Sequence, residues 1–341
     1  MQPITTAQAT VLLQAYIQQR HTILLAGPPG CGKSAIALQA AQALGYDSLV
    51  LHPVTSDPTD FKGFPWVEKG QADFIPFGEF KRILTATKPL VVIFDDLGHA
   101  PKAVQATLMQ PLWARELNGK KIPDHVSFVL CSNRRGDKAG VEGILDPILT
   151  RCHGVFEIKP DLDTFMAYWV KVGKRPEVVG YLRNFPDHVF QAKKSADIEN
   201  FPCYRTWDFA GDILNLQLGR EHEAVALAGA LGEGVAGQFG TYLRTYRDLP
   251  DIDEVLKNPL KVKLPEKLDI IHALCIAVAY RTSDKTFPAI AQLVQRMEKQ
   301  GNEELAIYLL RDCRSRWPEC LQTPDGVKIC QGKLGKLILS E

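Results

Sequence analysis

The sequence predicts an α/β fold: a five-stranded parallel sheet sandwiched by helices, followed by an all-helical lid and a C-terminal helical region. Short, continuous apolar runs recur through the first part of the chain, as in parallel strands buried on both faces. Long crossovers separate these runs and leave room for covering helices. From Pro160 onward the strand-like runs disappear and helical periodicity replaces them. We therefore predict three domains, which are residues 1–159, 160–247 and 248–341.

The composition is that of an ordinary globular protein. The 341 residues are 45% hydrophobic and 23% charged, which suffices for a sizeable core. A net charge of +1 gives no general reason to expect a nucleic-acid or membrane surface. The chain has eight cysteines, no CxxC pair, no signal-peptide pattern and no apolar run that could span a bilayer. These features predict a reduced, cytoplasmic protein that is not associated with a membrane.

A glycine-rich loop follows the first strong strand. Residues 5–20 have helical spacing with Thr5 or Thr6 as a cap, and the apolar run 22–26 comes next. A good helix former, residues 35–44, follows the loop. The loop between them fits G-x-x-x-x-G-K-[ST] and consists of Gly27, Pro28, Pro29, Gly30, Cys31, Gly32, Lys33 and Ser34.

This strand, loop and helix predict a P-loop that binds a nucleoside triphosphate. Glycines let backbone N–H groups approach phosphate oxygens, and the helix N-terminus adds free donors and partial positive charge. Lys33 can reach the β- and γ-phosphates, and the Ser34 hydroxyl can ligate Mg²⁺. A chance match to an ordinary glycine-rich turn is the alternative, and the flanking elements make it improbable.

A second strand, residues 48–52, precedes a long segment of residues 54–88 that we expect to be irregular. Prolines and glycines punctuate it, and the aromatic residues Phe61, Phe64 and Trp66 alternate with charges. Long irregular segments in α/β domains are usually functional. The aromatics could contact a partner or cover the edge of the sheet, and we weigh the two equally.

Two carboxylates end the buried strand at residues 89–94. We expect this strand to lie beside the P-loop strand. Asp95 is then placed to hold Mg²⁺ and Asp96 to orient the attacking water.

A further hairpin and strand follow. Pro111 should kink or end a helix over residues 101–110. Asn118-Gly119 predicts a two-residue hairpin turn that projects Lys120 and Lys121 outward, either into solvent or toward a partner or DNA. The strand 126–133 ends in Asn133, whose amide can hydrogen-bond the catalytic water or the γ-phosphate.

The rest of the chain is predicted to be almost entirely helical. A helix over residues 144–150 leads to Arg151, and residues 154–158 form the last strand. Helices are then expected over residues 162–172, 176–184, 206–217, 221–231, 237–246, 265–280, 287–299 and 303–313.

Taken together, these motifs resemble an AAA+ ATPase of the MoxR-like branch. The loop at 27–34 matches Walker A, the run 91–96 matches Walker B, and SNRR places sensor 1 at Asn133. DPILTR resembles the segment that ends in an arginine finger, which implies Arg151, and YRTWDF resembles the start of a sensor-2 helix, which implies Arg205. DPTDFKGFP resembles the insert of this branch, and the Asn118-Gly119 hairpin occupies the place of its pre-sensor-1 hairpin.

The resemblance implies an ATP-hydrolysing, Mg²⁺-dependent remodelling ATPase that assembles as a homo-oligomeric ring, expected to be a hexamer. It implies a chaperone that activates a partner protein, often one with a von Willebrand factor A domain or a metal-containing enzyme. Arg151 would complete a neighbour's site in trans, and Arg205 would sense the phosphate in cis.

One departure concerns Asp96, because the family usually has glutamate there. The aspartate side chain is about 1.5 Å shorter, and misplacement by about 1 Å can cost on the order of 10²-fold in rate. We expect hydrolysis to persist but to be slow. Arg134 and Arg135 are read as a solvated pair rather than as ligands of a neighbour's nucleotide.

Two other classes of function compete with this reading. A nucleotide-switched DNA-associated factor, such as a helicase loader or a phage or defence component, would show strongly salt-dependent DNA affinity. A small-molecule kinase is disfavoured by the helical lid and the second arginine. The eight histidines are isolated and are assigned core or surface roles.

Overall fold

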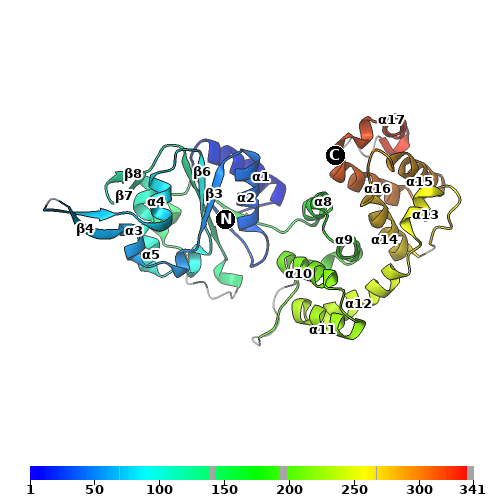
Figure 1. The fold of residues 1–341 in the computed structure, drawn as a ribbon, viewed down its shortest axis with the longest axis horizontal. Coiled ribbons are helices and arrows are strands. Elements are labelled where there is room, and N and C mark those ends of the chain that lie inside the picture. Colours follow the sequence, from blue (N-terminus) through cyan, green and yellow to red (C-terminus); the bar gives the residue numbers. More distant parts are fainter. Residues whose placement is uncertain (69, 138–140, 142, 192–197, 266, 336–341) are drawn as a thin grey trace. The chain divides into compact units, whose positions relative to one another are not determined.

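The computed structural model describes the chain except residues 69, 138–140, 142, 192–197, 266 and 336–341 (Figure 1). The chain divides into two compact units, Met1–Asp161 and Leu162–Glu341. Among the described residues, no helix is both long enough and apolar enough to span a lipid bilayer.

The first unit is built on a parallel sheet of six strands, not five. Their order is β1 (Gln2–Ile4), β10 (Gly154–Ile158), β2 (Ile23–Ala26), β9 (Val126–Ser132), β6 (Leu90–Phe94) and β3 (Asp47–Leu51). The additional strand, β1, pairs with β10 at the edge of the sheet. It has only three residues and includes Pro3, so it shows no apolar run, and proline is tolerated on an edge strand.

The strand order corrects one expectation. The strand that ends in Asp95 does not lie beside the P-loop strand, because β9 pairs with both β2 and β6 and separates them. Long crossovers allow several strand orders, so the succession of apolar runs along the chain did not decide this one. Asn133, which follows β9, consequently lies next to the P-loop strand, as expected.

Helices cover both faces of this sheet (Figure 1). On one face lie α1 (Thr6–Gln18) and α2 (Lys33–Ala43), and Ser127 on β9 donates a hydrogen bond to the carbonyl of Ile17. Thr5 caps α1 through a reciprocal pair of bonds with Gln8. The other face carries α4 (Gly78–Leu84), α5 (Lys102–Thr107), α6 (Met109–Trp113) and α7 (Asp146–Leu149), which share one apolar core with the sheet.

Pro111 acts as predicted but lies inside a helix. The expected helix over residues 101–110 breaks at Leu108, between α5 and α6. The break follows from the ring of Pro111, which would clash with the carbonyl four residues earlier, at Thr107.

The segment 54–88 is more regular than expected. It forms α3 (Pro58–Lys62), an antiparallel hairpin of β4 (Phe64–Glu68) and β5 (Gln71–Ile75), and then α4. Pro58 occupies the first turn of α3, where its missing N–H costs nothing. Gly63 ends α3 with φ 88°, and a Cβ there would lie 2.6 Å from the carbonyl oxygen of Ile75. The punctuating residues therefore mark element boundaries rather than an irregular loop.

The Asn118-Gly119 turn is confirmed. It joins β7 (Glu116–Leu117) to β8 (Lys120–Lys121), with φ 50° at Asn118 and 72° at Gly119, as a type I′ turn requires. Lys120 does not point freely into solvent. Its ammonium donates to the carbonyl of Phe74 at 2.9 Å, and Asn118 Nδ2 donates to the carbonyl of Phe61 at 2.9 Å. The β4–β5 and β7–β8 hairpins are thus tied together, and we call them the hairpin pair.

The second unit is helical, because the structure describes no strand in it. The α-helices described there are α8 (Leu162–Val172), α9 (Pro176–Asn184), α10 (Tyr204–Asn215), α11 (Arg220–Leu231), α12 (Glu233–Arg247), α13 (Ile252–Lys257), α14 (Leu268–Ala279), α15 (Phe287–Lys299), α16 (Glu303–Arg316) and α17 (Pro324–Gln331). The short helices α13 and α17 lie outside the ranges that the sequence predicts to be helical.

Two apolar cores stabilise this unit, and α14 contributes to both. Ala273 and Ile276 pack into the core formed by α8–α12, whereas Leu274 and Val278 pack into the core formed by α13–α17. The predicted division between residues 247 and 248 stays a prediction.

Candidate functional site

The glycine-rich loop connects β2 to α2 as the motif predicts. Gly30 and Gly32 have φ 75° and 88°, and α2 begins at the next residue, Lys33. A Cβ on Gly27 would lie 3.0 Å from Cys31 Sγ and 3.2 Å from the carbonyl oxygen of Ile158. Burial raises the pKa of the Cys31 thiol, although the charge of Lys33 opposes the shift. The loop is therefore tightly packed, with a neutral thiol inside it.

Lys33 is buried, and its ammonium group is fully hydrogen-bonded. Nζ donates to the carbonyls of Gly27 and Pro28 at 3.0 Å each and to Asn133 Oδ1 at 2.8 Å. An ammonium has three protons, so these acceptors satisfy all of them. The structure thus brings together two predicted site residues that lie 100 positions apart in the chain.

Ser34 and Asp95 also meet. The Ser34 hydroxyl donates to Asp95 Oδ2, and the backbone N–H of Asp96 donates to Asp95 Oδ1 at 2.9 Å. A hydroxyl and a carboxylate are oxygen ligands of the kind that Mg²⁺ prefers, usually together with water and phosphate oxygens. The donor set therefore fits the predicted Mg²⁺ site.

Asp96 turns the chain at the end of β6. Its backbone is left-handed, with φ 53° and ψ 31°. Its carboxylate is 43% exposed, and Oδ1 lies 3.8 Å from Nδ1 of His99. The second acid is therefore accessible to solvent at the same edge of the sheet as Asp95.

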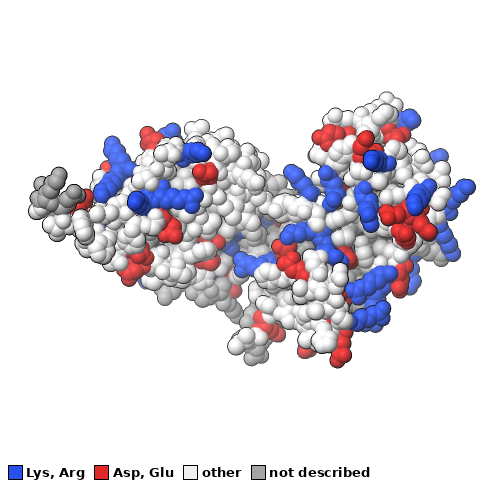
Figure 2. Space-filling view, viewed as in Figure 1, with Lys and Arg blue, Asp and Glu red and all other residues white. Residues whose placement is uncertain are grey.

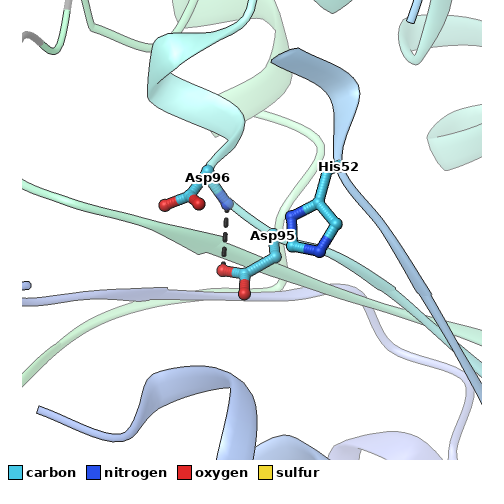
Figure 3. A group of neighbouring side chains, drawn as sticks. All are labelled: His52, Asp95 and Asp96. Carbon is cyan, nitrogen blue, oxygen red and sulfur yellow. Dashed lines mark hydrogen bonds between the residues drawn. The ribbon is translucent and has the colours of Figure 1, made fainter. Parts of the chain in front are cut away.

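His52 is a site residue that sequence reasoning missed. Figure 3 shows it beside Asp95 and Asp96, and one ligand atom from each of the three lies within 4.8 Å of the others. A signal was present in the sequence, because His52 is the last residue of the predicted strand 48–52 and parallel strands present their carboxyl ends at one edge. The sequence alone predicts only a core or surface role for this histidine, because Asp95 and Asp96 lie more than 40 positions further along the chain.

Arg134 is not part of a solvated pair. Its guanidinium donates to both carboxylate oxygens of Asp137 and to Glu157 on β10, and its side chain is 32% exposed. Since β2 lies between β9 and β10, this side chain connects the two strands that flank the P-loop strand. These bonds hold Arg134, the residue directly after Asn133, in place.

Arg151 lies away from this site within the chain. It precedes β10, at the amino end of the strand, whereas Lys33, Asp95 and Asn133 gather where parallel strands end. Its Nη1 donates to the carbonyl of Pro147, and its buried Nε has no hydrogen-bond partner among the described residues.

Arg205 belongs to the second unit. It lies in the first turn of α10 with an exposed side chain. Its predicted action on the phosphate stays a prediction.

Comparison with known protein families identifies the class of domain that holds the glycine-rich loop. Residues 22–148 match the AAA domain of the dynein-related subfamily, a span that contains the loop, both acids and Asn133. The chain accordingly has a P-loop AAA+ fold, in which a parallel sheet flanked by helices is followed by a helical C-terminal region.

Solved structures with a detectable likeness are remote. A RuvB variant from Thermotoga maritima is 15% identical, with 96% of this chain and 95% of that chain covered and a TM-score of 0.36. The T. maritima RuvB Holliday junction branch migration motor is 14% identical, with 94% and 89% covered and a TM-score of 0.35. NtrX from Brucella abortus in complex with ADP is 13% identical, with 71% and 67% covered and a TM-score of 0.34. No curated protein matches the sequence.

Proposed function

We propose that this chain binds ATP with Mg²⁺ and hydrolyses it to remodel or activate a partner protein, as a MoxR-like AAA+ ATPase. The observation that carries the proposal is the convergence of Lys33, Asn133, Ser34 and Asp95 at the strand ends. Neither contact is local in sequence, and together they join the phosphate loop to both of the polar strand ends that hydrolysis would use.

When a nucleotide binds, the Lys33 ammonium would exchange its present hydrogen-bond acceptors for phosphate oxygens and would stay fully hydrogen-bonded. Phosphate oxygens replace the carbonyls of Gly27 and Pro28 and the amide of Asn133 as acceptors for Lys33. The free N–H groups at the start of α2 stabilise the same oxygens. When bound by Ser34 and Asp95, Mg²⁺ would neutralise charge on the β- and γ-phosphates.

Hydrolysis requires a positioned water. The carboxylate of Asp96 accepts a proton from this water, while the amide of Asn133, released from Lys33, orients it or the γ-phosphate. The carboxylate of Asp96 is exposed, so a water molecule can reach it.

Arg151 supports assembly as a ring. It lies at the amino end of β10, so its own chain does not present it to its own phosphate site. A neighbour arranged head-to-tail would place it against the γ-phosphate, and such heterologous contacts form a ring when the rotation between subunits closes. We propose a homo-oligomer, specifically a hexamer, with Arg205 acting in cis from the helical lid.

The hairpin pair is the proposed contact with the partner protein. Trp66 and Val67 are 52% and 67% exposed, and Phe64 is also exposed, so β4 presents apolar side chains to solvent. A partner with a von Willebrand factor A domain is the candidate that the MoxR-like assignment suggests.

Among its described residues, the first unit shows no feature that favours DNA over a protein partner. Lys120 donates a hydrogen bond to the carbonyl of Phe74, and basic and acidic side chains are interspersed on the visible face of the first unit (Figure 2). We therefore do not propose DNA as the partner. Cytoplasmic location stays a prediction from the cysteine pattern.

The test uses two variants separately and as a mixture. Lys33→Ala should lose ATP binding, whereas Arg151→Ala should bind ATP normally and lose turnover by on the order of 10³-fold or more. Mixing the two variants should restore part of the turnover, because a Lys33→Ala subunit still supplies Arg151 to its neighbour. Fluorescent-nucleotide titration and phosphate release measure both quantities, and Arg220→Ala, an exposed arginine on α11, is the matched control.

Unchanged turnover in Arg151→Ala, or a mixture that recovers nothing, would overturn the shared site. Particle images with a slowly hydrolysed ATP analogue should show rings, and a persistent monomer would contradict the assembly.

A further inference from the structure

His52 adds a nitrogen ligand to the acidic strand end. It follows β3 and the two aspartates follow β6, and these strands pair in parallel with Leu51 opposite Phe94. The pairing places His52 beside the two aspartates, with one ligand atom of each of the three residues within 4.8 Å of the others, and Figure 3 shows the imidazole next to Asp95. None of the roles assigned to Asp95 and Asp96 in ATP hydrolysis requires a histidine.

The conformation of Asp96 keeps both acids within reach of one ion. Successive side chains of a strand point to opposite faces, which would separate neighbouring carboxylates. The left-handed backbone at Asp96 ends this alternation, and its N–H bonds to Asp95 Oδ1 at 2.9 Å. Each carboxylate oxygen has two lone pairs, so Asp95 can still accept a cation.

We propose that His52, Asp95 and Asp96 form a binding site for a first-row transition cation such as Zn²⁺ or Mn²⁺. Imidazole nitrogen binds Zn²⁺ and similar ions well, whereas Mg²⁺ strongly prefers oxygen. A cation with bonds of about 2.1 Å holds neighbouring ligands about 3 Å apart, so the three atoms need to close in from their present spacing. His52 is exposed to solvent.

The proposal rests on the proposed function in one respect, which is that Asp95 also serves the Mg²⁺ that accompanies ATP. A cation held by His52 occupies Asp95 and therefore competes with Mg²⁺–ATP. The site would act as an inhibitory cation site of the nucleotide-free protein.

The experiment uses Mn²⁺ as the probe, with the full chain and no nucleotide. Electron paramagnetic resonance measures free Mn²⁺ during a titration, and wild type should bind one ion per chain. His52→Ala should weaken binding by about tenfold, and His222→Ala, an exposed histidine on α11, should leave it unchanged. Zn²⁺ should displace Mn²⁺ at a concentration at least about tenfold below that of Mg²⁺, and His52→Ala should reduce this advantage.

Equal Mn²⁺ affinity in wild type and His52→Ala, or displacement by Mg²⁺ as readily as by Zn²⁺, would overturn the site. Lys33→Ala separates this result from the proposed function, because it should keep the His52-dependent ion while losing ATP. His52-dependent Mn²⁺ binding by a wild type that does not hydrolyse ATP would contradict only the proposed function. Hydrolysis without a His52-dependent ion would contradict only the cation site.

Discussion

At the scale of single residues, the backbone at position 96 explains an unusual side chain. The left-handed conformation is costly for most L-residues, and aspartate and asparagine tolerate it best because their short side chains bond locally. Asp96 stands where the resembled family usually has glutamate. The structure thus supplies a physical reason for the shorter acid, since the backbone at this turn favours it.

Two substitutions separate the backbone role of Asp96 from its chemical role. Asp96→Glu should lower the free energy of unfolding by about 1 kcal/mol, because glutamate lacks the local tolerance of aspartate. Asp96→Asn should preserve stability and lose turnover, because it keeps the conformation and removes the carboxylate. Urea unfolding and phosphate release measure the two effects. Equal stability of Asp96→Glu and wild type would contradict this account of the turn.

At the scale of elements, the hairpin pair depends on Lys120. Its ammonium bonds to the carbonyl of Phe74 and lies 3.4 Å from a carboxylate oxygen of Asp73 on the same strand, β5. Asn118 adds a bond from the turn to Phe61 of α3. A two-stranded hairpin is marginal by itself, so these contacts contribute to holding β4 and β5 in place.

Lys120→Met should loosen the hairpin pair, and Lys121→Met is the matched control because Lys121 is the adjacent, exposed lysine. An exposed pair of this kind contributes up to about 1 kcal/mol, so amide exchange in β4 and β5 should accelerate by up to about fivefold. Hydrogen exchange read by mass spectrometry measures the difference. The same exchange rate in both variants would show that Lys120 does not hold the hairpin.

At the scale of the whole molecule, a buried ion pair joins the two cores of the second unit. Arg183 on α9 donates two hydrogen bonds to Asp312 on α16, and the side chain of Asp312 is 2% exposed. Arg316 adds a bond from α16 to the carbonyl of Val170 on α8. The predicted lid and the C-terminal extension are therefore linked by polar contacts as well as by α14.

Removal of one partner should be more damaging than removal of both. Arg183→Met leaves a buried carboxylate unpaired and should cost about 3–5 kcal/mol. The double variant Arg183→Met, Asp312→Leu should recover most of that loss, because no buried charge remains. Chemical unfolding of the three proteins gives the comparison. A double variant as unstable as the single one would show that packing, not charge, dominates this contact.

The family match fits the reading of the motif at 27–34, and the fold confirms the apolar strands and most helices of the second unit, because these signals are local. A glycine-rich loop needs particular residues at adjacent positions, and a buried strand needs a continuous apolar run. The missed elements, β1, α3, β4, β5, α4, α13 and α17, are short, and their patterns are too brief or too interrupted to stand out.

The sequence by itself determined a triphosphate loop, two acids and an asparagine, each at the end of a strand. Only the tertiary structure decided that β9 separates the P-loop strand β2 from β6, the strand that the two acids follow, that Lys120 donates to the carbonyl of Phe74 and that His52 lies beside Asp95. These facts depend on which strands pair and which side chains meet over long separations in the chain. Such pairings are chosen by the free energy of the whole fold and leave no periodic signature in the residues that make them.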